Sequence, residues 1–122
     1  MKIYIAGKWE EHKLIAEYAK ELENRGHTIT FPWFTKHLGE TPLSVAATED
    51  LQGVLDADVC IFVFERMLPY SGAMSELGVA LGTGKEIYII GDGGDRNVFT
   101  HHPRVKRAQS FIELLEEQWK LS

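Results

Sequence analysis

The chain has 122 residues, 44% hydrophobic and 11% aromatic, which fits a single domain (1–122) with its own core. Thirteen Lys and Arg against 18 Asp and Glu give a net charge of -5, the wrong sign for a protein of nucleic-acid polymers or anionic membranes. One cysteine excludes a disulfide framework, and no apolar run is long enough for a membrane span or a signal peptide. We therefore expect a soluble, cytoplasmic protein whose ligand is a small molecule.

The first half of the chain alternates strand and helix patterns. Residues 2–6 are largely apolar and predict a first strand, and residues 10–25 carry apolar side chains at the spacing of one helical face. Gly26 is a natural stop for that helix. Residues 27–31 predict a second strand, which Pro32 ends.

Residues 33–43 have no periodicity and predict a long loop. Loops of this length often bind ligands, and the side chains of Trp33, Phe34 and His37 would suit stacking on a planar ligand. A loop that folds back on the core is an equally good reading.

The second half of the chain repeats the alternation. It begins with a helix capped by Ser44, a buried strand at 58–64 in which Cys60 packs, and a helix from Gly72 to about Gly82. A strand at 86–90 and a turn at 91–94 follow. A weaker strand at 105–109 leads to a final helix, capped by Ser110 and Glu113, that runs to about Lys120. Such units predict an α/β fold, a flavodoxin-like three-layer sandwich with a five-stranded parallel sheet in the order 2-1-3-4-5.

Several familiar ligand-binding motifs are incomplete in this chain. A phosphate loop that ended in Gly84-Lys85 would need Gly in place of Val79 and Ser or Thr in place of Glu86, and it should precede a helix. Residues 7–10 lack the repeated glycines of a dinucleotide site. Adjacent histidines such as His101 and His102 rarely converge on one ion. We therefore expect no metal and no cofactor.

Glu76 stands among small residues in the segment 70–80, which follows the buried strand. In an open α/β sheet, the turn from strand to helix lies at the carboxyl edge, where such folds bind ligands. Glu76 is therefore expected to begin a helix beside a pocket. The alternative is a solvated carboxylate that offsets the helix dipole.

Two other residues are candidates to join Glu76. The first and third strands are neighbours in the expected sheet, so Tyr4 can approach the turn before Glu76. Asp50 reaches the same edge if its helix enters from above the sheet. The rival carboxylates are Glu49, Asp56 and Asp58, of which Asp58 is interpreted as a cap at the start of its strand.

Three segments stand at a distinctive spacing. They are residues 3–9, Asp50-Leu51 eight positions before Asp58-Val59, and residues 72–80 followed by Gly84-Lys85. Together they resemble the nucleoside 2-deoxyribosyltransferase superfamily, which includes the 2′-deoxynucleoside 5′-monophosphate N-hydrolases. The resemblance covers residues 2 to about 90.

The resemblance implies cleavage of the N-glycosidic bond of 2′-deoxyribonucleosides and transfer of the deoxyribosyl group to another base. It makes Glu76 the nucleophile that forms a covalent intermediate, places Asp50 at the leaving base and makes Tyr4 the residue that orients Glu76. The residue types suit this chemistry, because a carboxylate can trap the developing sugar cation and a second carboxyl group can protonate the departing base.

The resemblance also implies a set of substrate-binding residues: Gly7, Trp9, Tyr70, Ser71, Gly72, Asn97 and Phe99. The hydrolases carry Ser and the transferases Asp where this chain has Tyr70. Trp9 and the segment 97–99 are more similar to the transferases, in which that segment reaches a neighbouring subunit's site. We therefore expect a homodimer or higher homo-oligomer that acts on a deoxynucleoside and a free nucleobase.

Two alternatives stay open at this stage. In the first, water is the acceptor and the protein is a 2′-deoxynucleoside 5′-monophosphate N-hydrolase, in which Lys8, Arg66 or Arg96 would hold the phosphate. In the second, the protein is a non-catalytic nucleotide-binding or sensing module on the same fold.

Overall fold

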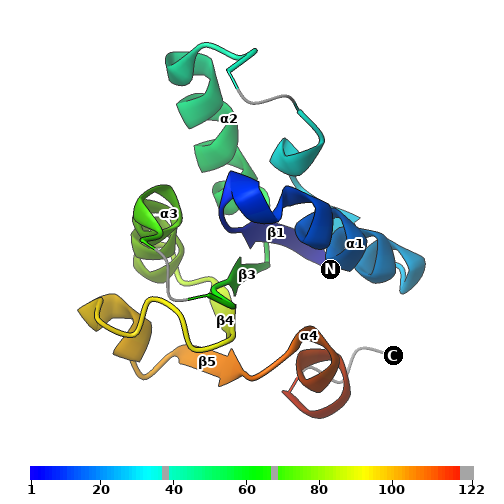
Figure 1. The fold of residues 1–122 in the computed structure, drawn as a ribbon, viewed down its shortest axis with the longest axis vertical. Coiled ribbons are helices and arrows are strands. Elements are labelled where there is room, and N and C mark those ends of the chain that lie inside the picture. The colour runs from blue at the N-terminus through cyan, green and yellow to red at the C-terminus, as the bar shows by residue number, and fades with distance from the viewer. Residues whose placement is uncertain (37–38, 67–68, 119–122) are drawn as a thin grey trace.

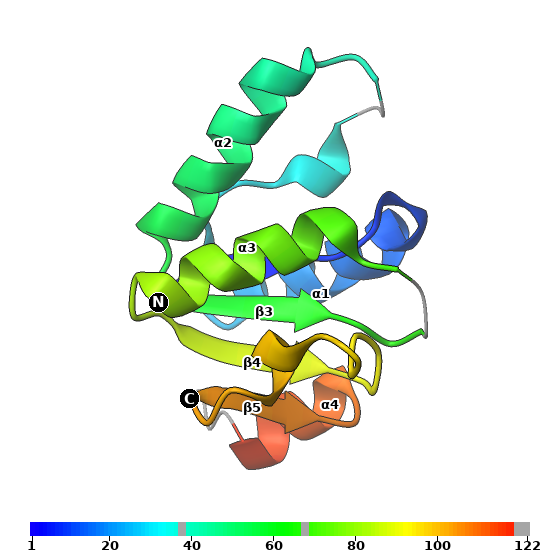
Figure 2. The ribbon, with the colours of Figure 1, turned by 90° about the vertical axis from the view of Figure 1, so that its left-hand side faces the viewer.

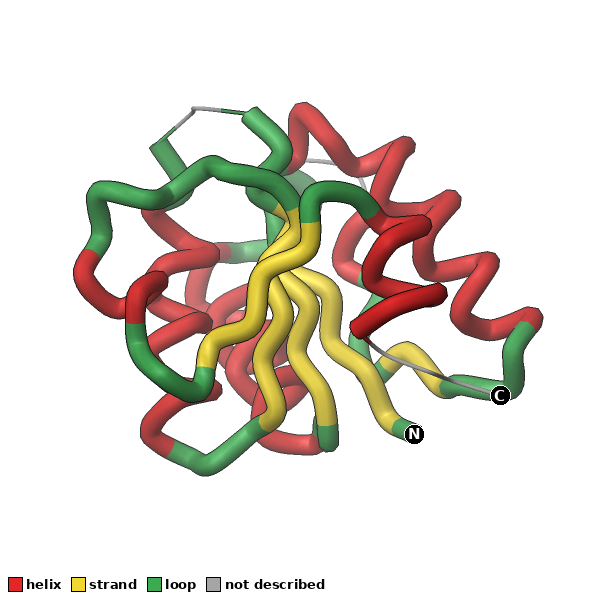
Figure 3. The backbone as a smooth tube through the Cα atoms, turned by 90° about the horizontal axis from the view of Figure 1, so that it is seen from below, coloured by secondary structure: helices red, strands yellow, loops and turns green. Residues whose placement is uncertain are grey.

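A computed structural model describes residues 1–36, 39–66 and 69–118 of the chain. Five strands form one parallel sheet in the order β2-β1-β3-β4-β5, as predicted (Figures 1 and 3). The strands are β1 (Lys2–Ala6), β2 (Thr28–Ile29), β3 (Val59–Val63), β4 (Glu86–Ile90) and β5 (Val105–Ala108).

Helices cover both faces of the sheet and make three layers (Figures 1 and 2). The helical elements are η1 (Trp9–Glu11), α1 (His12–Asn24), η2 (Trp33–Thr35), α2 (Leu43–Asp56), α3 (Ser71–Gly82), η3 (Val98–His101), α4 (Phe111–Glu113) and η4 (Leu114–Gln118). Within the described ranges, none of these helices has the length and apolar composition needed to cross a bilayer.

Side chains alternate between the two faces of each strand, and this alternation divides the core in two. Ile3 and Ile5 of β1 pack with α1 and α4, whereas Tyr4 and Ala6 pack on the opposite face with α2 and α3. Cys60 is fully buried in β3 on the same side as Tyr4, as expected for a packing residue.

Helix starts are the part of the fold that differs most from the predictions. Pro42, and not Ser44, occupies the N-cap of α2, and the Ser44 carbonyl accepts a hydrogen bond from the Thr48 hydroxyl inside the helix. Because α3 begins at Ser71, Glu76 lies in its second turn and does not begin the helix. The helix dipole therefore acts on Glu76 less than a first-turn position would allow.

Two other segments differ in detail. Only Thr28 and Ile29 of the predicted strand 27–31 pair with β1. At the C-terminal end, the Ser110 hydroxyl caps the backbone N–H of Glu113 at 3.1 Å, as predicted, and the helix continues as the π-helical turn η4. The predicted end near Lys120 lies outside the described residues.

A close contact between α2 and β1 generates the first testable prediction. A β-carbon at Gly53 would lie 2.8 Å from the Tyr4 ring and 2.9 Å from the Phe31 β-carbon, so Gly53→Ala overpacks this contact and should lower the free energy of unfolding by about 1–3 kcal/mol. A β-carbon at Gly78 of α3 would meet nothing within 4 Å beyond its own helix, so Gly78→Ala should raise the free energy of unfolding by about 0.5–1 kcal/mol. Urea denaturation of both variants checks the pair. A Gly53→Ala protein as stable as the wild type would show that Tyr4 moves aside at no cost.

Candidate active site

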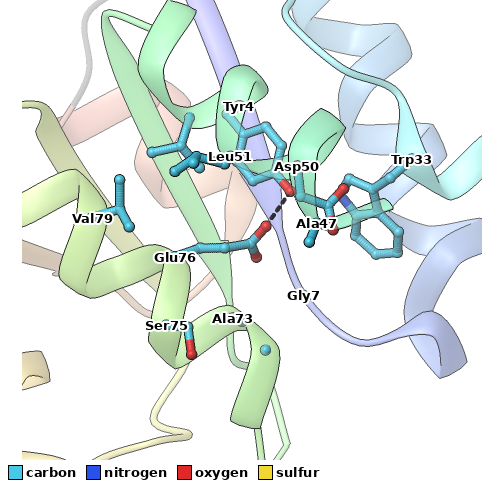
Figure 4. A pocket seen from close by; sticks show the side chains of 12 residues that line it. Tyr4, Gly7, Trp33, Ala47, Asp50, Leu51, Ala73, Ser75, Glu76 and Val79 are labelled. Carbon is cyan, nitrogen blue, oxygen red and sulfur yellow. Dashed lines mark hydrogen bonds between the residues drawn. The ribbon is translucent and has the colours of Figure 1, made fainter. Parts of the chain in front are cut away.

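A cavity of about 380 Å³ opens between α2 and α3, next to the carboxyl end of β1 (Figure 4). Tyr4 of β1 forms part of its wall, and Gly7 lines it just beyond that strand. From the helices, α2 contributes Asp50 and α3 contributes Gly72 and Glu76. The structure thus brings together the three predicted catalytic residues and two of the predicted substrate-binding residues.

The Tyr4 hydroxyl donates a hydrogen bond to Oε2 of Glu76 across the cavity (Figure 4). The ring of Tyr4 is fully buried under α2, which leaves the hydroxyl only a small range of positions. Burial is the largest cause that raises the pKa of this phenol far above its ordinary value, so Tyr4 remains a donor throughout the physiological range. A neutral phenol in a fixed place is suited to orient a carboxylate.

The pKa of Glu76 is raised from its ordinary value of 4.5 to about 7. Burial is the main cause because it disfavours the charged form, and the negative charge of Asp50 adds to it. The hydrogen bond from Tyr4 acts in the opposite direction by stabilising the carboxylate. Glu76 therefore changes protonation state near neutral pH.

Asp50 brings a second carboxyl group to the cavity from α2. Its side chain points into the same space as Glu76 and the Tyr4 hydroxyl (Figure 4). Burial, and then repulsion from Glu49, raise the pKa of Asp50 above its ordinary value. A raised pKa favours the protonated form of this carboxyl group, which is the form that a proton donor needs.

The rival carboxylates have other surroundings. Glu49 faces a neighbouring cavity. Asp56 accepts a hydrogen bond from the Gln52 amide at 2.8 Å. Asp58, directly before β3, accepts one from the backbone N–H of Lys2 at 3.0 Å and so anchors the start of β1. Asp50 is thus the member of this group that lines the Glu76 cavity.

The neighbouring cavity, about 300 Å³, has aromatic walls formed by Trp9, Phe31 and Trp33. Trp33 and Asp50 line both cavities and separate them. The indole N–H of Trp33 donates to the Ile5 carbonyl at 2.6 Å, which fixes this partition to the end of β1. A planar aromatic ligand next to Asp50 would find stacking partners here.

Two other residues of the 33–43 loop, Phe34 and His37, were predicted to suit stacking on a ligand. Phe34 is buried in the core, as in the reading of a loop that folds back, and His37 lies outside the described residues. The cavity residues Ala47, Leu51, Ser75 and Val79 were not predicted. Ala47 and Val79 lie three positions from Asp50 and Glu76 and so share a helix face with them, whereas Leu51 and Ser75 are their direct neighbours in the sequence.

Five predicted substrate-binding residues do not line the Glu76 cavity, and one of them, Trp9, lines the neighbouring aromatic cavity. Ser71 is exposed at the start of α3, and Phe99 is 54% exposed. Tyr70 and Asn97 line a separate cavity of about 490 Å³, and the Asn97 side chain caps η3 by accepting from the Phe99 N–H at 2.9 Å. The expected role of the 97–99 segment at a partner's site stays a prediction.

Among residues 1–36, 39–66 and 69–118, no group of three or more His, Cys, Asp and Glu side chains is placed to hold a metal ion.

Known proteins share the family sequence pattern and the fold of this chain. The sequence profile of the nucleoside 2-deoxyribosyltransferase family matches residues 3–109, a range that contains Tyr4, Asp50 and Glu76. A solved 2-deoxyribosyltransferase from the psychrotolerant bacterium Bacillus psychrosaccharolyticus is 21% identical, with a TM-score of 0.61 over 77% of this chain and 74% of that one. A conserved protein from Enterococcus faecalis V583 is 17% identical, with a TM-score of 0.72 over 96% of each chain. At these identities the two structures show a shared fold. No curated protein sequence matches the chain.

The raised pKa of Glu76 makes stability depend on pH. Between pH 4.5 and about 7 the folded state holds a proton on Glu76 that the unfolded state has released, so stability is lost as the pH rises through this window. Glu76→Gln keeps the shape without the charge. We expect the variant to be more stable than the wild type at pH 8 by about 2 kcal/mol, less than the full shift implies, because the carboxylate faces an open cavity.

Urea denaturation at two pH values checks this expectation. At pH 4, where the side chain at position 76 is uncharged in both proteins, the denaturation curves of the wild type and the variant should nearly coincide. A Glu76→Gln protein that is less stable than the wild type at pH 8 would contradict the raised pKa of Glu76.

Proposed function

The chain belongs to the nucleoside 2-deoxyribosyltransferase family, and on that premise we propose that it cleaves the N-glycosidic bond of a 2′-deoxyribonucleoside and transfers the deoxyribosyl group to another base. The observation that carries the proposal is the Tyr4–Glu76 hydrogen bond in a cavity that Asp50 shares. A retaining glycosyl transfer uses two carboxyl groups, and here the partly buried carboxylate of Glu76 is held by a phenol with the second carboxyl group facing it.

In the first step, an oxygen of the Glu76 carboxylate forms a bond to the sugar C1′ while the bond from C1′ to the base nitrogen breaks. The electron pair of the broken bond leaves with the base, and Asp50 supplies the proton that makes it a stable leaving group. Tyr4 keeps Glu76 in the reactive rotamer and opposes the effect of burial on its pKa. The product is a deoxyribosyl ester of Glu76.

In the second step, a nitrogen of the incoming base attacks C1′ and the ester bond to Glu76 breaks. The carboxylate of Asp50 accepts the proton that the incoming base loses, so both carboxyl groups return to their starting states. The two steps invert C1′ twice and retain its configuration.

The reaction depends on which carboxyl group holds the proton. The reactive form needs an ionised Glu76 and a protonated Asp50, that is, one proton shared by two carboxyl groups. The negative charge of Asp50 raises the pKa of Glu76 to about 7, so double ionisation is disfavoured and a site with one proton exists near neutral pH. In the free protein that proton lies mainly on Glu76, so the reactive form is the arrangement in which it has moved to Asp50.

The aromatic cavity beyond Asp50 supports a place for the base. With C1′ at Glu76, a base that receives a proton from Asp50 lies near the Trp33 partition, where Trp9 and Phe31 also present rings. Trp9 is itself stacked on His12 with ring centroids 4.0 Å apart, which steadies its orientation. This placement gives Trp9 the substrate-binding role that the sequence predicts.

The surroundings of two cations favour a nucleoside over a 5′-monophosphate. Lys8 lies 4.0 Å from Glu10, and Arg66 lies 3.7 Å from Glu11, so each of these candidate phosphate ligands already faces a carboxylate. Arg96 lines the separate cavity. Of these three cations, none is both free of a carboxylate partner and directed into the Glu76 cavity as the structure describes it, and this counts against the hydrolase alternative.

A product assay tests the proposed function. The protein is incubated with 2′-deoxynucleosides, their 5′-monophosphates and the matching ribonucleosides, with and without a second free base, and the products are separated by chromatography. We expect a new deoxynucleoside when a second base is present and much slower reaction of the ribonucleosides, because a 2′-hydroxyl withdraws electrons from the developing cation. Glu76→Gln should remove all turnover while its circular dichroism spectrum is unchanged.

Other results would point elsewhere. Free base as the sole product means that water is the acceptor, and a requirement for the 5′-phosphate means a nucleotide substrate. Full activity of Glu76→Gln would refute the covalent mechanism.

Asp50→Asn tests the proton donor. We expect the rate on natural deoxynucleosides to fall by about 10²–10⁴-fold, the usual contribution of general acid catalysis. A p-nitrophenyl 2-deoxyriboside is the matched control, since its leaving group departs without a proton and its rate should change little. An unchanged rate on natural substrates would move the role to Glu49, which lies at the adjoining cavity.

A further inference from the structure

Glu11 is a buried carboxylate that the proposed reaction does not use. Its exposed fraction is 7%, which is rare for a charged side chain. It ends η1, shortly after β1, and it lies near the carboxyl edge of the sheet where the Glu76 cavity opens. A buried charge at this place calls for an explanation in terms of its contacts.

The contacts of Glu11 lead to the start of α3. The Tyr70 hydroxyl donates to Oε1 of Glu11 at 3.2 Å and accepts from the backbone N–H of Arg66 at 3.3 Å. The ring of Tyr70 packs on Phe64 at the end of β3, with centroids 4.4 Å apart. Tyr70 is also the N-cap residue of α3, and its carbonyl accepts the first helical hydrogen bond, from Met74 at 3.0 Å.

Two tyrosine–carboxylate hydrogen bonds therefore join the β1 side of the chain to α3. The donor lies on β1 in one bond and at the start of α3 in the other. Tyr4 of β1 donates to Glu76 of α3, and Tyr70 at the start of α3 donates to Glu11 after β1. The cavity residues Gly7 and Gly72 belong to the chain segments between these two bonds. The first two turns of α3 are thus attached to the β1 side at both ends.

We propose that Glu11 is a positioning residue for catalysis, which acts through Tyr70 to hold the start of α3 and thereby keeps the Glu76 carboxylate against the Tyr4 hydroxyl. The catalytic part of this statement rests on the proposed function, whereas the positioning of Glu76 is a property of the folded protein. It also gives Tyr70 a role other than the substrate binding that the sequence predicts.

The charged groups around both carboxylates define what a titration would report. Glu11 faces Tyr70, Arg66, Glu65 and Glu10, and burial raises its pKa above the ordinary value. Glu76 faces Tyr4 and Asp50. Because the Tyr4 bond lowers the pKa of Glu76, weakening this bond raises that pKa as long as the burial of Glu76 is unchanged. The titration of Glu76 therefore reports on the Tyr4–Glu76 bond.

Carbon-13 NMR of the Glu76 carboxyl, assigned by its absence in Glu76→Gln, measures that titration without any need for turnover. We expect a midpoint at about pH 7 in the wild type. Tyr70→Phe, which deletes the hydroxyl alone, and Glu11→Met, which deletes the acceptor, should both move the midpoint upward. The shift should be smaller than in Tyr4→Phe, which removes the bond to Glu76 entirely. With a substrate that the wild type turns over, kcat should fall by about 10-fold in both variants while KM changes little.

Two controls separate positioning from a general loss of stability. Glu11→Gln keeps an acceptor for Tyr70 and should restore a near wild-type midpoint. Tyr18→Phe removes another phenol–carboxylate bond, from Tyr18 to Glu65 at 2.6 Å. Glu65 lies between β3 and α3 but is not the partner of Tyr70, so this change should leave the midpoint unchanged. The double variant Tyr70→Phe/Glu11→Met should shift no further than either single one, since both delete one contact.

An unshifted midpoint in both Tyr70→Phe and Glu11→Met overturns the proposal, and so does an equal shift in Tyr18→Phe. Shifted midpoints in a protein that turns over no substrate would uphold the positioning of Glu76 and count against the proposed function alone.

Discussion

A carboxylate that is partly buried between two helices is unfavourable unless a hydrogen-bond donor meets it, and for Glu76 that donor is the hydroxyl of Tyr4. The two residues are 72 positions apart in the sequence, so the bond exists only because the sheet places β1 beside β3, from which α3 departs. The balance between burial and this one bond leaves the pKa of Glu76 near neutrality. Stronger burial would keep the carboxyl group protonated, and full solvation would leave the carboxylate a weaker nucleophile.

The second carboxyl group depends on the same region through Gly53. Because Gly53 has no side chain, α2 can approach the Tyr4 ring closely, and the Thr30 hydroxyl binds the Gly53 carbonyl at 2.7 Å. Asp50 lies one helical turn earlier on α2 and so faces the same side. The close approach of α2 to β1 thus brings Asp50 to Glu76, although the two carboxyl groups come from different helices.

The strand order and the grouping of Tyr4, Asp50 and Glu76 were predictable from the sequence, because buried β-branched runs and the spacing of motifs depend on few long-range details. The ends of elements were harder to predict. Both Pro42 and Ser44 are acceptable helix starters, and residues 27–31 look like one strand until Thr30 turns toward α2. No local pattern indicates the Tyr70–Glu11 bond, which spans 59 positions, so Tyr70 was interpreted by its place in a motif and not by its contacts.

Trp33 has a consequence for how this site can diversify. Its indole is tied to the Ile5 carbonyl and stands as a fixed wall between the cavity with Glu76 and the aromatic cavity with Trp9 and Phe31. Residues on the far side of this wall can change in size or polarity without disturbing the geometry on the near side. Selection for a different aromatic ligand can therefore act on residues that line only the aromatic cavity, such as Lys36, Thr41 and Leu43, while the reacting groups stay unaltered. Ligand choice and reactivity can then evolve as separate traits.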